Sequence, residues 1–321
     1  MQRQEKVCSI CGGGFSEHLQ VKEEMFGLDE YFDYGLCGEC GCLQCASPPG
    51  DLSKYYPSDY YSFTPARATK SLKQARRGLK RRLVLTHPEI LSPLFKLWLS
   101  SFPMFWIYRQ LGVKLSDRLL DVGAGGGAHV AELRSAGARN ALGTDPFVAQ
   151  DVYENDLLLV RKGNLADIQG TFDLITFHHS LEHAIDQVGM LNQARNLLAE
   201  NGRILVRIPT VSSEAFDTYR EKWFQLDAPR HLFLHSHQSL RLVAEKAGLR
   251  VDDLFCDSGE LQFIASEQYR QGISLFDSRS YTVNKQNSVF RKAQIREFRE
   301  KTRRVNGELR GDQICAVLRP A

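Results

Sequence analysis

The stretch that decides the fold reads Asp117-Arg-Leu-Leu-Asp121-Val-Gly123-Ala-Gly125-Gly-Gly127-Ala128. It is an apolar strand that runs into an acidic residue and then into a glycine-dense turn, at which the next helix begins. A second acid, Asp145, closes another apolar run. Glycines let the backbone approach a bound cofactor or adopt positive φ. An acid at the second strand of a nucleotide-binding βαβ unit accepts hydrogen bonds from ribose hydroxyls. The stretch therefore predicts a nucleoside-binding site in a doubly wound α/β fold.

Two cofactors fit the glycines, because Gly123-x-Gly125-x-x-Ala128 also matches the relaxed dinucleotide fingerprint. Asp121 favours one of them. It stands two residues before the first glycine, where its carboxylate would approach the cationic amino-acid end of S-adenosylmethionine but would repel an anionic pyrophosphate. The Asp-x-Gly-x-Gly-x-Gly run, followed at residues 172–183 by Phe-Asp-Leu-Ile-Thr-Phe-His-His-Ser-Leu-Glu-His, resembles class I S-adenosylmethionine-dependent methyltransferases.

This resemblance implies a Rossmann-like fold with S-adenosylmethionine as the cofactor. In such sheets the ligand lies outside the carboxyl ends of the strands. Asn164 stands where the family often has an acid near the adenine, although it also suits a plain turn. His178 and His179 close the fourth strand beside the expected methyl group, and we expect one to face the cofactor and the other to pack. The predicted cofactor-binding residues are Asp121, Gly123, Ala124, Gly125, Gly127, Asp145, Asn164 and His178.

Strand and helix patterns alternate regularly from residue 116 onward, which is typical of a parallel sheet. Ser236 is suited to cap a helix that stops at Gly248. We expect an insertion, or cap, at 257–311 before the last strand, with a basic helix at 289–305 that covers the site or builds a dimer. The predicted strands lie at 118–122, 140–144, 158–161, 172–177, 203–208, 250–255 and 313–318, and further helices at 126–136 and 186–199.

Composition bounds the class of protein. A chain of 321 residues is long enough for one full α/β core and a smaller module. A net charge of +3 implies no polyanionic partner, so we expect no sequence-specific nucleic acid. No apolar stretch follows Met1, and the most apolar segment, 94–111, is interrupted by charges and a proline. We therefore expect a cytoplasmic protein.

Six of the eight cysteines lie in the first 45 residues. Cys8-x-x-Cys11 and Cys37-x-x-Cys40 are two knuckles with the spacing at which four thiolates converge on Zn²⁺. We therefore predict a structural zinc-ribbon-like module at residues 1–50. Cys42 and Cys45 form a third pair that could replace the second knuckle, and thiol redox chemistry is the alternative to metal binding.

Residues 51–115 are predicted to link this module to a methyltransferase domain at 116–321. Five aromatic residues within 55–63 either pack against the main domain or stack on a sugar. Residues 67–82 carry eight Lys or Arg and no acid, with Leu72, Ala75 and Leu79 at helical spacing. Such a basic helix can lie on an anionic membrane at the cytoplasmic face or contact phosphates, and the alternative is a solvated linker face. The apolar segment 95–108 favours a membrane-proximal or homodimer contact.

Candidate catalytic residues come from two segments. Methyl transfer from a sulfonium is an in-line displacement, so an alcohol acceptor needs a base, and histidine titrates in the useful range. His231 lies on the acceptor side of such folds and is the candidate base. Alternatively, His231 is a structural residue that fixes the loop through Asp227 or a backbone carbonyl. Arg230 could hold a phosphate or carboxylate of the acceptor. Glu182 and His183 either support the site or take part in catalysis, and we take His183 as the second candidate.

The likeness extends beyond the cofactor motif. The Cys-x-x-Cys pairs, the tyrosine-rich segment 52–63 and the Asp-Ala-Pro-Arg-His-Leu-Phe segment at 227–233 resemble bacterial methyltransferases of surface polysaccharide and sugar modification. Related sugar C-methyltransferases also carry an N-terminal zinc module, but their full catalytic motif has no match here, which favours O-methylation. The acceptor is thus expected to be a small molecule or glycan, including lipid-linked intermediates. The alternatives are an RNA or protein methyltransferase and a non-catalytic scaffold.

Overall fold

The structure is a computed structural model that describes residues 7–56, 61–63, 72–87 and 102–321. Several predicted features fall in part outside these residues: the aromatic Tyr60, the first part of the basic segment, 67–71, and the apolar residues 95–101. By packing, the chain divides into two compact units. Unit 1 is drawn from Met1–Tyr56, His179–Leu191 and Val206–Ala321, and unit 2 from Pro57–His178 and Asn192–Leu205. The three-part division made from the sequence stays a prediction.

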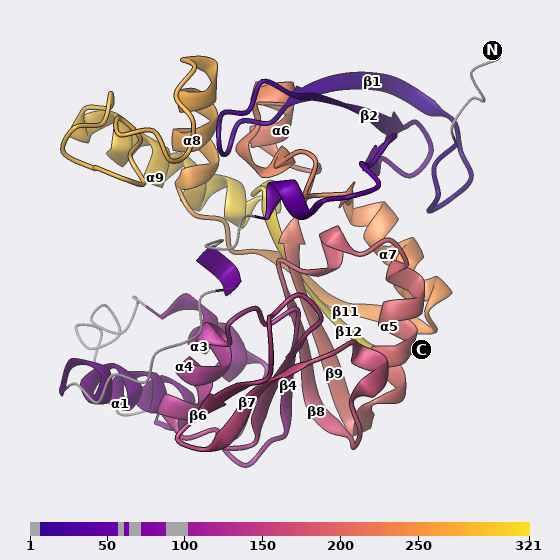
Figure 1. Cartoon of the computed structure of the whole chain (residues 1–321), viewed down its shortest axis with the longest axis vertical. Coiled ribbons are helices and arrows are strands. Elements are labelled where there is room, and N and C mark those ends of the chain that lie inside the picture. The colour runs from indigo at the N-terminus through magenta and orange to yellow at the C-terminus, as the bar shows by residue number, and fades with distance from the viewer. Residues whose placement is uncertain (1–6, 57–60, 64–71, 88–101) are drawn as a thin grey trace. The chain divides into compact units, whose positions relative to one another are not determined.

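An eight-stranded sheet has the order β11-β12-β9-β8-β4-β5-β7-β6 (Figure 1). In unit 2, β4 pairs in parallel with β5 and with β8, and β5 pairs in parallel with β7. In unit 1, β11 and β12 are antiparallel. The strands are β4 (Leu119–Val122), β5 (Ala141–Asp145), β6 (Val152–Glu154), β7 (Leu157–Lys162), β8 (Phe172–His178), β9 (Leu198–Pro209), β11 (Leu249–Cys256) and β12 (Gln313–Pro320).

The predicted fold class, a mixed α/β sheet of Rossmann-like type, is confirmed. All four positions of β4 are buried, which explains why three of its four residues are apolar and Asp121 is the exception. Helices α4 (Ala128–Ala136) and α5 (Gln187–Asn196) follow β4 and β8 as expected. The predicted helix at 186–199 ends three residues too late, because α5 ends at Asn196 and β9 already begins at Leu198. The predicted helix at 289–305 is α9 (Lys292–Gly307).

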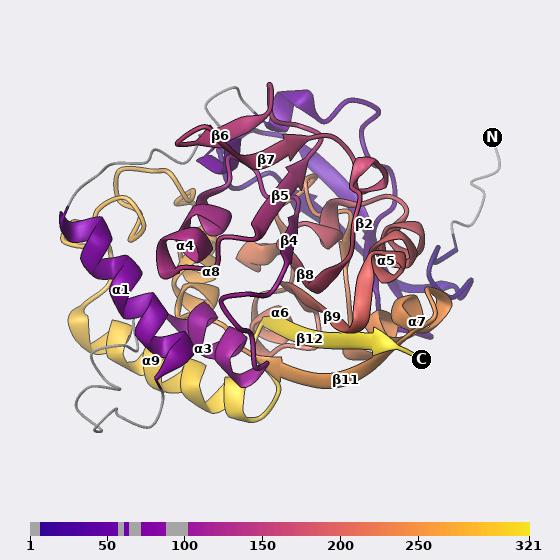
Figure 2. The ribbon, with the colours of Figure 1, turned by 90° about the horizontal axis from the view of Figure 1, so that it is seen from below.

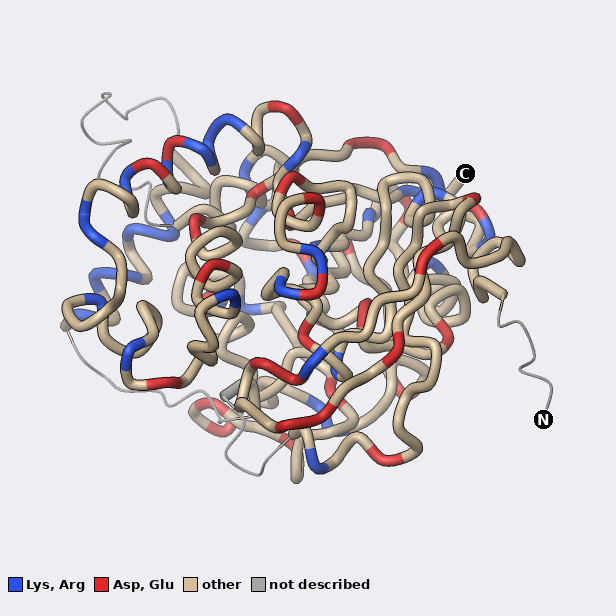
Figure 3. Tube along the Cα trace, turned by 90° about the horizontal axis from the view of Figure 1, so that it is seen from above, with Lys and Arg blue, Asp and Glu red and all other residues tan. Residues whose placement is uncertain are grey.

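In unit 2, α1 (Leu72–Thr86) packs against α3 (Pro103–Gln110) and α4 (Figure 2). The sequence of α1 contains Lys and Arg but no Asp or Glu, whereas basic and acidic residues are interspersed over much of the traced chain (Figure 3). The predicted apolar face is not the one that packs: Leu72 is 81% exposed and Leu79 is 58% exposed. Arg81 instead pairs with Glu132 of α4. None of the helices in the described part of the chain combines the length and apolar composition that crossing a bilayer requires.

In unit 1, the N-terminal residues form a four-stranded sheet of order β1-β2-β3-β10. Its strands are β1 (Phe15–Lys22), β2 (Tyr31–Cys37), β3 (Leu43–Cys45) and β10 (Phe233–Leu234). This sheet shares one hydrophobic core with α6 (Glu214–Tyr219), α8 (Leu261–Arg270) and α9, through side chains such as Val21, Phe216, Trp223, Phe263 and Val305. Helix α7 (His237–Lys246) is capped by Ser236 as predicted, with the Ser239 N–H donating to its side chain at 2.9 Å.

Candidate functional site

The glycine turn after β4 is tightly specified. Gly123, Gly125 and Gly127 all have positive φ, between 53° and 81°. A Cβ at Gly127 would lie 2.7 Å from Val160, and one at Gly125 would overlap the carbonyl oxygen of Ser62. That same oxygen accepts a hydrogen bond from the N–H of Gly126 at 2.7 Å. The short helix η2 (Tyr61–Phe63) therefore lies directly against the turn, a contact that the sequence did not indicate.

Asp121 is the acid at the carboxyl end of β4, and its side chain is almost fully buried. The Thr176 hydroxyl of β8 donates to its Oδ1 at 2.7 Å. Burial raises the pKa of Asp121 to about 7, although this hydrogen bond acts to lower it. Within the described residues no ion pair is formed by Asp121, and a buried carboxylate in such a place gains from a ligand that brings a positive charge, such as the ammonium of S-adenosylmethionine.

Asp145 and Asn164 follow neighbouring parallel strands. Asp145 accepts hydrogen bonds from the N–H of Gly125 to Oδ2 and from the N–H of Phe147 to Oδ1, both at 2.8 Å. These bonds fix the carboxylate beside the glycine turn and leave a second lone pair on each oxygen for ribose hydroxyls. Asn164 is exposed, and its backbone N–H donates to Asp167, so it also starts the short helix η3 (Leu165–Asp167).

His178 ends β8 and belongs to a partly buried polar cluster in unit 2. The hydroxyl of Tyr108 lies 2.8 Å from its Nε2, and the same hydroxyl contacts Nε2 of His129. The two imidazole centroids are 4.6 Å apart. Tyr108 lies on α3 and His129 in the first turn of α4, so neither stood out in the sequence. The usable signal was a histidine immediately after the glycine turn.

His183 and His231 meet around Glu182 in unit 1. Both oxygens of the fully buried Glu182 carboxylate lack a hydrogen-bond partner among the described residues. His231 Nε2 lies 3.9 Å from Oε1, and one ligand atom from each of the three side chains falls within 4.8 Å of the others. The Leu232 N–H donates to the Glu182 carbonyl at 2.9 Å, which ties the two segments together.

The contacts of His231 agree with both of its predicted roles, that of a structural residue and that of a general base. Its Nδ1 lies 2.7 Å from the Gln225 carbonyl oxygen. A carbonyl oxygen can only accept, so Nδ1 carries the proton and Nε2 has the lone pair. Burial lowers the pKa of His231 to about 4, against the opposing charge of Asp227. The imidazole is therefore neutral at physiological pH.

From the sequence, Arg230 was a candidate to hold a phosphate or carboxylate of the acceptor. Its guanidinium is not available for this role. It is fully buried, and two carboxylates already bind it. It donates to both oxygens of Asp227, at 3.0 and 2.6 Å, and to Glu23 at 2.9 Å. The expectation was wrong because burial at this position depends on Glu23, which lies 207 residues away.

The chain matches the family described as "Methyltransferase domain" over residues 81–254, more than half of its length. The chain belongs to the methyltransferase domain family. The prediction of an S-adenosylmethionine-dependent methyltransferase is thereby confirmed, while the individual site residues stay predictions. No curated protein sequence matches the methyltransferase.

Three solved structures illustrate what the methyltransferase is similar to. Geranyl diphosphate C-methyltransferase from Streptomyces coelicolor A3(2) has 14% identity and a TM-score of 0.46, covering 84% of this chain and 97% of that one. The O-methyltransferase of a Brevibacillus brevis trans-AT PKS multienzyme has 13% identity and a TM-score of 0.43, covering 81% and 82%. Mitomycin 7-O-methyltransferase MmcR has 13% identity and a TM-score of 0.41, covering 75% of this chain and 60% of that one. Similarities this remote say nothing of the acceptor.

The four predicted metal ligands of the methyltransferase come together. One sulfur from each of Cys8, Cys11, Cys37 and Cys40 lies within 4.8 Å of the others, with Cys8 and Cys40 at 3.6 Å and Cys11 and Cys37 at 3.4 Å. Thiolates bound tetrahedrally at about 2.3 Å from Zn²⁺ are separated by roughly 3.8 Å, so these distances suit the ion. Backbone N–H groups of residues 13 and 40 approach two of the sulfurs, at 3.4 and 3.5 Å. The alternative pair at 42 and 45 stands outside this group.

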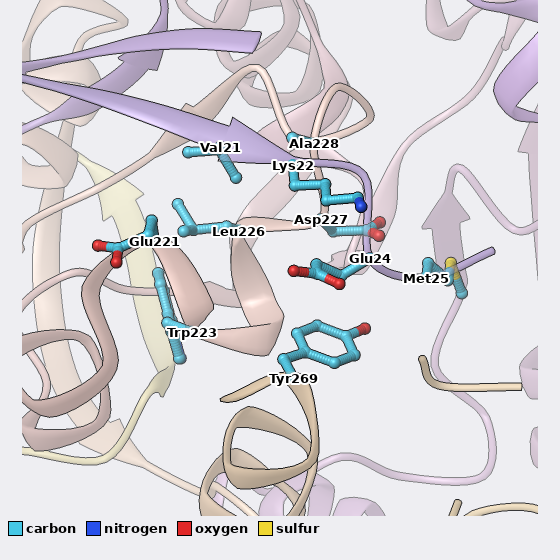
Figure 4. Close-up of a pocket in the computed structure, with 10 residues that line it drawn as sticks. All are labelled: Val21, Lys22, Glu24, Met25, Glu221, Trp223, Leu226, Asp227, Ala228 and Tyr269. Carbon is cyan, nitrogen blue, oxygen red and sulfur yellow. The ribbon is translucent and has the colours of Figure 1, made fainter. Parts of the chain in front are cut away.

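A small cavity also lies in unit 1 of the methyltransferase, beside the end of β1 (Figure 4). Lys22, Glu24, Trp223, Asp227 and Tyr269 are among its lining residues. Its volume of about 10 Å³ holds at most one water molecule. It is therefore not the binding site of an acceptor.

Proposed function

We propose that this methyltransferase transfers the methyl group of S-adenosylmethionine to a hydroxyl of a sugar, in a glycan or a glycan precursor. The observation that carries the proposal is the pair of imidazoles at the Glu182 carboxylate. An alcohol is a poor nucleophile until its proton is removed, and His231 presents an unprotonated Nε2. The sugar acceptor itself rests on the resemblance of the cysteine, tyrosine-rich and 227–233 segments to sugar methyltransferases.

In the proposed reaction the acceptor oxygen attacks the methyl carbon as the bond from that carbon to the sulfonium breaks. The hydroxyl proton passes to Nε2 of His231, and the products are the methyl ether and neutral S-adenosylhomocysteine. The resulting imidazolium would be stabilised by Glu182 and Asp227, whose oxygens lie 3.9 and 3.8 Å from Nε2. His183 supports the site from the other side, with its ring centroid 4.9 Å from that of His231.

Cofactor binding is assigned to unit 2. We propose that the backbone of Gly123, Ala124, Gly125 and Gly127 cradles the amino-acid end of the cofactor, with Asp121 paired to its ammonium. Asp145 would bind the ribose hydroxyls, Asn164 the adenine and His178 the region of the methyl group. In unit 1, the four cysteines would hold Zn²⁺, which closes the coordination sphere and leaves the ion a structural role.

The test is an acceptor screen in which S-adenosylhomocysteine release is measured with nucleotide sugars, lipid-linked sugars, RNA and protein. The proposal expects release with a sugar and a new methyl ether in the product. Release with RNA or protein only would refute it, and the RNA arm can be checked by its salt sensitivity. Absence of turnover with every acceptor class would support the scaffold alternative.

His231→Ala tests the assigned base. The expected result is a fall in kcat of about 10²-fold or more with S-adenosylmethionine affinity unchanged, because general-base catalysis contributes on that scale. His18→Ala, at an exposed position on β1, is the matched control and should leave kcat unchanged. An equal loss of cofactor affinity in His231→Ala would instead make the residue structural.

A further inference from the structure

The Glu182 carboxylate lies in the interior of unit 1, where neighbouring histidines are the groups that lower its pKa against the effect of burial. Its side chain is 0% exposed, and neither oxygen has a hydrogen-bond partner among the described residues. His179 Nδ1 lies 3.3 Å from Oε1 but without hydrogen-bond geometry. A buried carboxylate that lacks hydrogen bonds destabilises the folded protein, and proteins compensate such groups with a cation or a metal ion.

Both neighbouring imidazoles have their proton on Nδ1 and their lone pair on Nε2. His231 Nδ1 lies 2.7 Å from the Gln225 carbonyl oxygen, and His183 Nδ1 lies 2.8 Å from the Arg230 carbonyl oxygen. Each Nδ1 must therefore donate, which leaves the lone pair on Nε2 of both rings. A backbone carbonyl that fixes the tautomer in this way is the usual outer partner of a metal-ligating histidine.

The distances fit a metal ion better than a direct hydrogen bond. The separation of 3.9 Å between His231 Nε2 and Glu182 Oε1 is too long for a hydrogen bond. Two ligands at about 2.1 Å from a tetrahedral ion are roughly 3.4 Å apart, so rotamer shifts of a few tenths of an ångström would close the site. The third ligand lies within the same 4.8 Å sphere.

The net negative charge around Glu182 also favours the binding of a cation. Glu23, Glu182 and Asp227 are three carboxylates, and Arg230 is the guanidinium that binds two of them. With neutral imidazoles, this group of four carries a formal charge of minus two. Arg230 compensates Glu23 and Asp227 by direct hydrogen bonds, whereas Glu182 makes no such bond.

We propose that Glu182, His183 and His231 form a second metal site, which takes a divalent first-row transition-metal ion and is separate from the four-cysteine cluster. Two imidazole nitrogens and one carboxylate oxygen are ligands that Zn²⁺, Co²⁺ and Mn²⁺ accept, and three protein ligands leave a coordination position open. An ion bound there would act as a Lewis acid toward a hydroxyl group in that position. In the metal-bound form both histidines would act as ligands of the ion. The ion would lower the pKa of a coordinated hydroxyl, and the hydroxyl proton would pass to solvent water instead of to His231.

The experiment measures metal binding without cofactor or acceptor, so its outcome is independent of the proposed methyl transfer. The zinc-loaded methyltransferase is titrated with Co²⁺, followed by calorimetry and visible absorption, and bound metal is counted by elemental analysis. The proposal expects one ion beyond that of the cysteines, with an absorption spectrum free of thiolate charge transfer.

Glu182→Gln keeps the shape of the side chain and should weaken the second ion by roughly a hundredfold or more, since loss even of an outer partner costs 10- to 100-fold. His183→Ala should act alike, while His237→Ala, on α7 outside the cluster, should bind as wild type does. Retention of cysteine-bound zinc in each variant reports that unit 1 is folded. Absence of a second ion in the wild type at millimolar Co²⁺, or undiminished binding in Glu182→Gln, would overturn the proposal.

Discussion

Replacing Arg230 by methionine should strongly destabilise unit 1. The guanidinium is fully buried and donates to Glu23, to Asp227 and to the backbone carbonyl of Tyr55. Methionine fills much of the volume but leaves Glu23, itself 0% exposed, and Asp227 without their cation. Removing one partner of a buried ion pair costs about 3–5 kcal/mol. A loss of this size is a large part of the 5–15 kcal/mol by which domains are typically stable.

The pH dependence of this loss follows from the carboxylates. Burial acts to raise the pKa of Asp227, but Arg230 outweighs this and the pKa is lowered. In the wild type this stabilisation is present above the unfolded pKa of about 3.9 and is lost as the pH falls through the folded pKa. In Arg230→Met burial would raise the pKa of the unpaired Asp227, so the penalty of its charge is present at pH 7 and declines on acidification. The difference in stability between variant and wild type should therefore shrink from pH 7 toward pH 4.

The assay is urea unfolding followed by circular dichroism and tryptophan fluorescence, in zinc-replete buffer, at several pH values. Arg220→Met is the matched control, because its pair with Glu17 is partly exposed, at 30% and 46%, and should be worth no more than about 1 kcal/mol. The reasoning would be refuted if Arg230→Met unfolded within about 1 kcal/mol of wild type at pH 7, or if the difference did not shrink with acid. A stable variant with a raised KM for an anionic acceptor would restore the anion-binding role.

Three further predictions concern the cofactor turn and the cysteines. Gly125→Ala should weaken the binding of S-adenosylmethionine about tenfold or more, because the positive φ and the neighbouring Ser62 carbonyl both oppose a Cβ. The control Gly112→Ala, at a similar φ in open space, should keep the affinity of the wild type. Equal affinities of the two variants in calorimetry would contradict this prediction. Affinity for S-adenosylmethionine should rise as the pH increases through about 7, because Asp121 ionises in this range. Asp121→Asn should abolish that rise. A parallel rise in the variant would exclude Asp121 as the cause. Cys37→Ser should lose the zinc seen by elemental analysis and Cys256→Ser should keep it, so full zinc in the first variant would argue against the four-cysteine site.

The parallel core could be predicted from the sequence because its strands are buried on both faces and contain continuous apolar runs. The β6–β7 hairpin was missed, since β6 has only three residues, none of them buried. A signal did exist. Asn155 and Asp156 both adopt positive φ between the two strands, and such a pair is typical of a two-residue hairpin turn.

Single residues of the candidate site could be predicted from the sequence, but the cluster that Glu182, His183 and His231 form could not. The glycine turn and the cysteine knuckles have fixed local spacing, and the structure brings each together. The cluster of Glu182, His183 and His231 joins segments that no local pattern connects, and Glu182 was the member with the least distinctive context. Likewise nothing in Pro229-Arg230-His231 indicates that the arginine is buried and paired with Glu23, because the pairing of distant segments depends on tertiary packing.

The central claim is that the glycine turn with Asp121 and Asp145 binds S-adenosylmethionine. The most direct measurement is calorimetric titration of the zinc-replete protein with S-adenosylmethionine, S-adenosylhomocysteine and NAD in parallel. The account predicts binding of both adenosyl compounds at roughly micromolar Kd and no binding of NAD. Binding of NAD alone would contradict the interpretation of Asp121, and absence of binding by all three would contradict the cofactor site itself.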